Sequence, residues 1–211
     1  MMKIILVLIC IHFSLVNYAQ ESSFQPELLI GNRSAMFQHF LKLPVNKKLS
    51  ITNNFLIDNE YSTSENRIFF FRNSLNYHFT KRWQVNSAVG LKNPGLFMTI
   101  AWTYSVITDQ KAFSYTVGFT IQKEISFEQT LIYRRSLIEF RQYQLQSQIV
   151  IIANFDRSGY SRGIQQFRLG VQRASTQLGL GLNLDQFGNS SKTLFNTGVY
   201  LKQIIIKNNN L

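Results

Sequence analysis

Residues 98–121 read MTIAWTYSVITDQKAFSYTVGFTI, and this stretch indicates the fold class. In a β-strand successive side chains point to opposite faces, so the residues can be sorted by parity. From residue 98 to 106 every second side chain is large and apolar, while the side chains between them are small or polar. The same alternation resumes after Lys111. The pattern predicts a β-hairpin with one apolar face and one small, polar face.

The length of the two arms is compatible with a membrane. Each arm has about ten residues, which is the length that crosses a bilayer when a strand is tilted by about 45°. An apolar content of 45% fits a membrane barrel, because the lumen face of each strand offsets its lipid face. After residue 20 the chain has no run of 18 apolar residues, which excludes a helical membrane protein. A soluble β-sandwich can show the same alternation in one hairpin. Whether the alternation recurs along the whole chain therefore decides between a sandwich and a membrane barrel.

The alternation recurs over most of the chain. Clear strands are expected at residues 68–79, 83–92, 166–172 and 177–184, and weaker ones at residues 36–43, 49–58, 125–135, 137–152 and 193–205. A change of phase near Arg141 indicates a bulge. Every second connection is tight, and longer loops are expected at residues 59–66, 153–163 and 185–192. A further strand within residues 22–32 makes twelve, although Pro26 weakens it and leaves ten as the alternative.

These features predict an all-β protein, an antiparallel up-and-down transmembrane β-barrel of about twelve strands that forms a single domain over residues 20–211. Before it, Lys3 and the apolar residues 4–16 lead to a cleavage site after Ala19, so residues 1–19 are interpreted as a signal peptide. The only cysteine is Cys10. The mature chain therefore has no thiol for a disulfide, for catalysis or for a metal.

The lumen of the predicted barrel is rich in charge. Parity places these charged side chains inward: Lys42, Asp58, Arg72, Lys92, Glu128, Arg134, Glu139, Arg141, Arg168 and Lys202. One interpretation is that the two signs pair across a narrow barrel and plug it. The other is that the excess of cations lines a pore for anionic solutes. The net charge of +11 is spread singly over the strands, which argues against a nucleic-acid surface.

Catalytic and metal-binding patterns are weak. His39 and His78 have no second histidine or carboxylate at a metal-ligand spacing, so neither a metal nor another cofactor is expected. Ser74 and His78 share the lumen face four residues apart, about 13 Å by strand rise, which is too far for a hydrogen bond. A base for Ser74 from another strand stays open. No catalytic residue is assigned, and the protein is expected not to be an enzyme.

Three stretches resemble small outer-membrane β-barrel proteins of the Bacteroidota type: NYAQ at residues 17–20, SLNYHFTKRWQVNSAVGLKN at residues 74–93 and LGLGLNLDQFGNSSKTLFNTGVYLKQ at residues 178–203. The resemblance is one of general sequence pattern, covers most of the mature chain and identifies no characterised family. It implies the outer membrane of a Gram-negative bacterium as the location. It also implies that the barrel assembly machinery recognises a signal in the final strand, although Gln203 occupies a position where an apolar residue is usual.

The leading functional hypothesis is a non-enzymatic outer-membrane barrel. It would serve as a narrow, anion-preferring channel or as the membrane anchor of an envelope complex. The alternatives are a barrel enzyme that acts on lipid, as a hydrolase or acyltransferase, and a secreted soluble β-sandwich. The expected partners are outer-membrane lipid, the assembly machinery and either small anionic solutes or an envelope protein, with no nucleic acid. The sequence leaves open the solute, the oligomeric state and whether the lumen is plugged.

Overall fold

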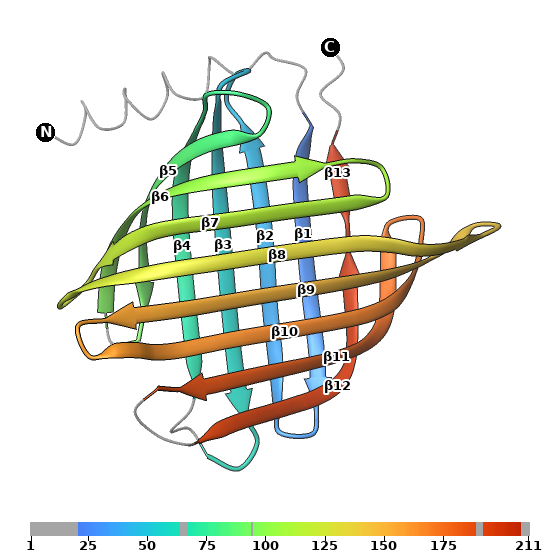
Figure 1. Cartoon of the computed structure of the whole chain (residues 1–211). Helices are drawn as coiled ribbons and strands as arrows, with labels where there is room; N and C mark the ends of the chain where they lie inside the picture. Colours follow the sequence, from blue (N-terminus) through green and yellow to red (C-terminus); the bar gives the residue numbers. More distant parts are fainter. Residues whose placement is uncertain (1–20, 64–66, 94, 189–191, 208–211) are drawn as a thin grey trace, which may run out of the picture.

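The computed structural model describes residues 21–63, 67–93, 95–188 and 192–207. The signal peptide expected at residues 1–19 lies outside these residues. The described chain folds into one antiparallel sheet that closes on itself (Figure 1). Its strands are β1 Ser22–Gly31, β2 Ser34–Pro44, β3 Leu49–Glu60, β4 Ile68–His78, β5 Trp83–Lys92, β6 Gly95–Ile107, β7 Lys111–Ile121, β8 Ile125–Phe140, β9 Tyr143–Asp156, β10 Gly159–Arg173, β11 Thr176–Phe187, β12 Thr193–Gln203 and β13 Ile205–Lys207.

The sheet closes between its first and last long strands. Each strand from β1 to β12 pairs with its neighbour in sequence, and β12 pairs with β1, where Glu27 lies opposite Lys202. The short β13 continues along the first residues of β1. The strand that contains Pro26 therefore forms, and the prediction of twelve strands is confirmed. Because twelve is even, β1 begins and β12 ends at the same end of the barrel, here called the terminal end. The opposite end is the loop end.

Burial follows the alternation in the sequence. On β6, Ile100 and Trp102 are more than half exposed, whereas Thr103 between Trp102 and Tyr104 is 4% exposed. Thr103 faces the interior, where its hydroxyl hydrogen-bonds Thr116 of β7 at 2.8 Å. Large apolar side chains cover the outside of a barrel only when the surrounding medium is itself apolar. No helix of the described residues is long and apolar enough to cross a membrane.

The strands at the loop end are longer than the sequence predicted. The prediction of a long loop at residues 153–163 is wrong. The strands β9 and β10 continue into that segment and leave a turn of only two residues, Arg157 and Ser158. The Asp156 side chain accepts a hydrogen bond from the Ser158 backbone N–H at 2.8 Å. Gly159 follows with φ +106°, a conformation that glycine adopts without strain. Residues 185–187 likewise belong to β11.

The bulge predicted near Arg141 lies elsewhere. The register of β8 against β9 shifts between Ser136 and Ile138, so Leu137 is the extra residue. This shift lets Ile138 lie opposite Leu145 and keeps apolar side chains on the outer face. Arg141 lies in the turn that joins the two strands, with φ +54°. Residues 137–152 are therefore two strands and not one.

Tyr200 packs inside the barrel beside the closing seam. Its side chain is 1% exposed and forms an apolar cluster with Leu29 and Met36. The ring crosses β11 and reaches Gly170 on β10, where an added Cβ would lie 2.4 Å from the Tyr200 hydroxyl. At Gly179, between them, an added Cβ would lie 2.2 Å from the backbone oxygen of Leu169. Glycine at these positions lets the strands and the ring approach closely.

Candidate functional site in the barrel lumen

Charged side chains meet across the lumen. Arg72 on β4 donates from Nη2 to Oε1 of Glu128 on β8 at 2.9 Å. Three strands separate β4 from β8 in the sheet, so these side chains meet by reaching through the interior. The Arg72 guanidinium also lies 5.2 Å from the ring centre of Phe70 and 5.3 Å from that of Phe97. Lys92 lies 5.0 Å from the Phe97 ring, so aromatic faces carry part of the cation contact.

A buried ion pair lies beside the closing seam. Arg168 on β10 donates from Nε to Oε1 of Glu27 on β1 at 2.8 Å, and both side chains are 3% exposed or less. Gln38 donates to the same carboxylate oxygen at 2.8 Å. The guanidinium also donates to Asn183 at 2.9 Å. These hydrogen bonds offset part of the cost of burying both side chains away from water.

Two further lumen cations have only neutral partners. Arg134 donates to the side-chain oxygen of Gln25 at 3.4 Å, and Lys202 donates to that of Gln148 at 3.4 Å. Lys202 is 6% exposed. Over the described ranges, no carboxylate lies within ion-pair distance of Arg134 or Lys202. The hydrogen-bond partners of these two basic side chains are therefore amides and not carboxylates.

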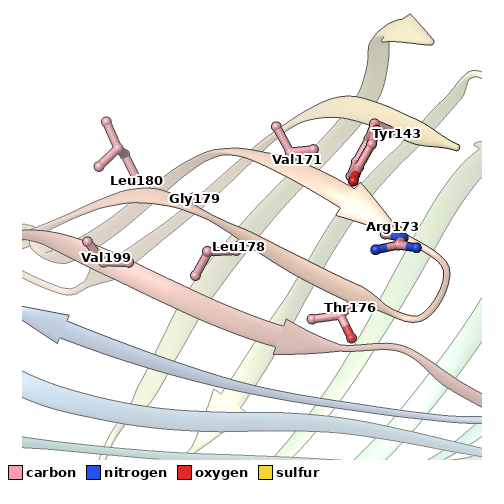
Figure 2. Close-up of a pocket in the computed structure, with 8 residues that line it drawn as sticks. All are labelled: Tyr143, Val171, Arg173, Thr176, Leu178, Gly179, Leu180 and Val199. Carbon is pink, nitrogen blue, oxygen red and sulfur yellow. The ribbon is translucent and has the colours of Figure 1, made fainter. Parts of the chain in front are cut away.

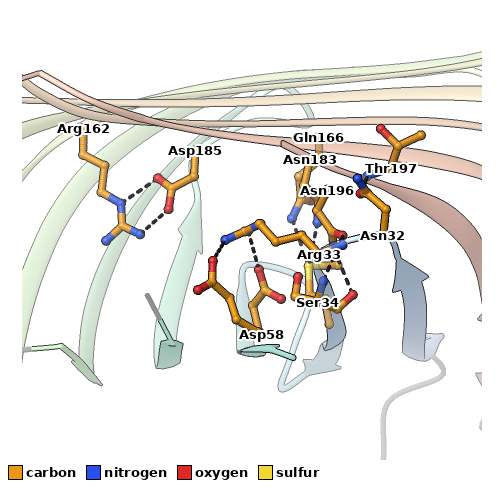
Figure 3. Close-up of polar contacts among 12 residues, drawn as sticks. Asn32, Arg33, Ser34, Asp58, Arg162, Gln166, Asn183, Asp185, Asn196 and Thr197 are labelled. Atoms are coloured by element: carbon orange, nitrogen blue, oxygen red, sulfur yellow. Dashed lines mark hydrogen bonds and ion pairs between the residues drawn. The ribbon is translucent and has the colours of Figure 1, made fainter. Parts of the chain in front are cut away.

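Acids and arginines also gather near the loop end (Figure 3). Arg162 binds Asp185 through two hydrogen bonds of 2.9 and 2.7 Å. Arg33, in the turn after β1, pairs with Asp58 at 3.3 Å and also with Glu60. Asn196 is fully buried beside them and accepts hydrogen bonds from the backbone N–H groups of Arg33 and Ser34 at 3.0 and 3.1 Å. These contacts fix the β1–β2 turn against β12.

Comparison with known proteins gives a fold and no family. No protein-family model and no curated protein matches the chain. Among solved structures, the NanC porin aligns with a TM-score of 0.56 and 8% identity over 88% of this chain and 99% of that one. The KdgM porin aligns with a TM-score of 0.54 and 7% identity over 87% and 98%. The fold is that of an outer-membrane β-barrel. The apolar outer wall agrees with this, and the chain is a protein of the Gram-negative outer membrane.

The structure places most of the predicted lumen charges on inner faces of the barrel, with two exceptions. Glu139 has the inward parity but is exposed at the terminal end of the β8–β9 hairpin, where it accepts a hydrogen bond from Gln144. Arg141 lies in the exposed turn of that hairpin, with its guanidinium 5.2 Å from the Phe140 ring. It is therefore not on a strand face. The remaining predicted residues that alternate inward are Lys42, Asp58, Arg72, Lys92, Glu128, Arg134, Arg168 and Lys202.

Sequence reasoning missed five charged residues of the lumen and its mouth: Glu27, Arg33, Glu60, Arg162 and Asp185. Arg162 and Asp185 fell in segments that were expected to be loops. Glu27 follows Pro26, which had weakened the first strand. Its parity, shared with Leu29 and opposite to that of Leu28 and Ile30, is the signal that places it inside the barrel once that strand is accepted.

His78 has a serine partner from a neighbouring strand. Its Nε2 lies 3.1 Å from the hydroxyl oxygen of Ser50 on β3. Ser74, the serine considered from the sequence, is not its partner. In the part of the chain that the structure describes, no carboxylate contacts His78. No group of three histidine, cysteine or acidic side chains that could hold a metal occurs in that part either.

The barrel also has a shallow depression on its outer wall (Figure 2). Val171, Leu178, Leu180 and Val199 form its apolar part, and Gly179 forms its floor. At the terminal end the Arg173 guanidinium lies 5.7 Å from the ring centre of Tyr143. Arginine and tyrosine at this height suit the boundary between hydrocarbon and water. The depression therefore belongs to the lipid-facing surface and is separate from the lumen.

Proposed function

We propose that the protein is a non-enzymatic, narrow channel of the outer membrane that prefers anionic solutes. The observation that carries the proposal is the pair of lumen cations, Arg134 and Lys202, whose hydrogen-bond partners are the neutral amides of Gln25 and Gln148. A wall that carries one sign of charge in a low-dielectric channel concentrates counter-ions. Outer-membrane lipid, the barrel assembly machinery and small anionic solutes are the partners that this function implies.

The paired charges have a different role in this proposal. The Arg72–Glu128 and Arg168–Glu27 pairs cancel their own charge and reach into the passage, so they narrow it. Arg134 and Lys202 supply the positive field. Lys42 has the inward parity on β2 and adds a cation toward the terminal end. Small anions are the solutes that fit a narrow lumen with this field.

Planar-bilayer recording under a KCl gradient tests the proposal. The wild type should give a zero-current potential of anion-selective sign. The double variant Arg134→Gln with Lys202→Gln should shift that potential toward the cation-selective side, while Arg173→Gln on the outer wall should leave it unchanged. A wild type that does not conduct, or a double variant with unaltered selectivity, would contradict the channel function.

A second function, that of a membrane anchor for an envelope complex, is favoured by one observation. The Arg72–Glu128 bridge crosses the interior at 2.9 Å, and such bridges could seal the lumen. Absence of conductance in the wild type, with conductance appearing in Glu128→Ala, would support this sealed barrel. The Ser50–His78 pair offers less to a lipid-acting enzyme, because a histidine base is ordinarily oriented by a third group.

A further inference from the structure

Three polar side chains form a row of hydrogen bonds across the outer wall of the barrel, here called the ladder. They are His39 on β2, Asn53 on β3 and Asn73 on β4, and they have the outward parity. His39 Nε2 lies 2.7 Å from the Asn53 side-chain oxygen, and the Asn53 nitrogen donates to the Asn73 oxygen at 2.8 Å. His39 and Asn73 each lie five residues from both ends of their strands. The polar ladder therefore lies at the middle of the wall that faces hydrocarbon.

The ladder leaves polar groups without partners. Across the described ranges, the side-chain nitrogen of Asn73 and Nδ1 of His39 make no hydrogen bond. Asn73 is exposed on the outer surface. An acyl chain offers neither donor nor acceptor, so a polar group in the hydrocarbon region is costly unless protein supplies a partner.

A smaller polar pair lies on the outer face of β7 and β8. On β8 the oxygen of Gln129 accepts a hydrogen bond from the Tyr115 hydroxyl at 2.7 Å, and this pair spans only two neighbouring strands. The ladder spans three strands, and Asn73 at its end is exposed, whereas Gln129 is partly buried. Gln129 therefore serves as a control for the ladder.

Aromatic rings pack around the His39 end of the ladder. The His39 ring stacks on Phe55 with centroids 5.5 Å apart and an interplanar angle of 16°. Phe24 lies 5.3 Å from His39 on the other side, and Phe69 packs edge-on against Phe55 at 5.8 Å. The aromatic contacts hold the His39 end of the ladder in one position, which lowers the entropy cost of docking a partner there.

We propose that a second copy of this chain docks on the ladder and forms a symmetric dimer within the membrane. An amide both donates and accepts, so the surface around Asn73 is complementary to itself across a two-fold axis. A two-fold contact requires such self-complementarity. In the dimer, the free amide N–H groups of Asn73 bind amide oxygens of the other copy. The phenylalanines beside the ladder then pack against the facing wall.

Disulfide trapping tests the contact directly. The variant Leu75→Cys, in a Cys10→Ser background, has a single cysteine on the same outer face of β4, two residues from Asn73, and leaves the Asn73 amide intact. Oxidation in native outer-membrane vesicles should yield a disulfide-linked dimer, whereas Ile100→Cys on the wall of β6 should stay monomeric under the same conditions. Equal dimer yields from both positions, or a crosslink from Leu75→Cys to a different protein, would overturn the proposal.

A second measurement does not depend on the cysteine. Mass spectrometry of the wild type from lipid nanodiscs should show dimers. The double variant Asn53→Leu with Asn73→Leu should weaken dimerisation by about tenfold or more, as expected for the loss of hydrogen bonds between chains in a membrane. Because leucine suits hydrocarbon, that variant should still fold, and Gln129→Leu should leave dimerisation unchanged. A monomeric wild type would overturn the proposal, as would a double variant that dimerises as well as the wild type.

Discussion

At the residue scale, the interior of this barrel is held together by a few polar side chains with specific partners. Arg168 illustrates the principle, because its charge is almost fully buried and is compensated by Glu27. Removing one member of a buried pair leaves the other charge without compensation, which costs far more than the net contribution of the intact pair. The lumen pairs are therefore expected to matter for stability as well as for any passage.

The Glu27–Arg168 pair gives the first prediction. Glu27→Gln should lower the free energy of unfolding by about 3–5 kcal/mol, because Arg168 keeps its charge and loses its carboxylate. Glu139→Gln is the matched control, since Glu139 is exposed, and it should cost less than about 1 kcal/mol. Urea unfolding in lipid vesicles measures both. Similar losses for the two variants would mean that the buried Arg168 does not depend on Glu27 for compensation.

Close approach of strands gives the second prediction. Gly179→Ala places a Cβ 2.2 Å from the Leu169 backbone oxygen and 2.4 Å from the Gly170 Cα, so the strands must separate. We expect a loss of about 1–3 kcal/mol. Gly95→Ala meets no atom within 4 Å and should change stability by less than about 1 kcal/mol. The same unfolding assay compares them, and a neutral Gly179→Ala would show that the strands have room to move.

At the element scale, the middles of the strands could be predicted from the sequence and some of their ends could not. Period-two alternation exists only where one face meets hydrocarbon and the other meets the lumen. Beyond the membrane both faces meet water, so Asn154, Asp156 and Ser158 resembled a loop although they belong to a continuous hairpin. The bulge was misplaced for a related reason: residues 137–152 were interpreted as one strand, so the change of phase at Arg141, which is the turn between β8 and β9, resembled a bulge.

The β6–β7 hairpin gives the third prediction. Ile100→Arg should cost roughly 2–4 kcal/mol of folding free energy in vesicles, because it places a charge on the lipid face near mid-membrane. Thr103→Arg should depend on space and pairing within the lumen instead, since Thr103 hydrogen-bonds Thr116 and Asn86. Folding yields over a series of bilayer thicknesses separate the two effects. Only the cost of Ile100→Arg should depend on thickness, and the same dependence for both variants would argue against the face assignment.

At the scale of the whole molecule, closure of the sheet determines which residues meet, and the sequence does not reveal this. Arg72 and Glu128 are 56 residues apart in the chain, and Glu27 and Arg168 are 141 apart. Parity predicted that Arg72, Glu128 and Arg168 face inward, but only the closed barrel shows which partner each one finds. For the same reason the sequence does not show that Arg134 and Lys202 bind amides and not carboxylates, on which the proposed anion preference rests.

All of these conclusions depend on one claim, that alternate residues of each strand face lipid and lumen. Spin labels placed one at a time at residues 98–105 in membrane vesicles test it most directly, through their collision rate with oxygen, which concentrates in hydrocarbon. The account predicts high rates at residues 98, 100, 102 and 104 and low rates at residues 99, 101, 103 and 105. Rates that do not alternate along β6, or that peak at the odd-numbered positions, would contradict it.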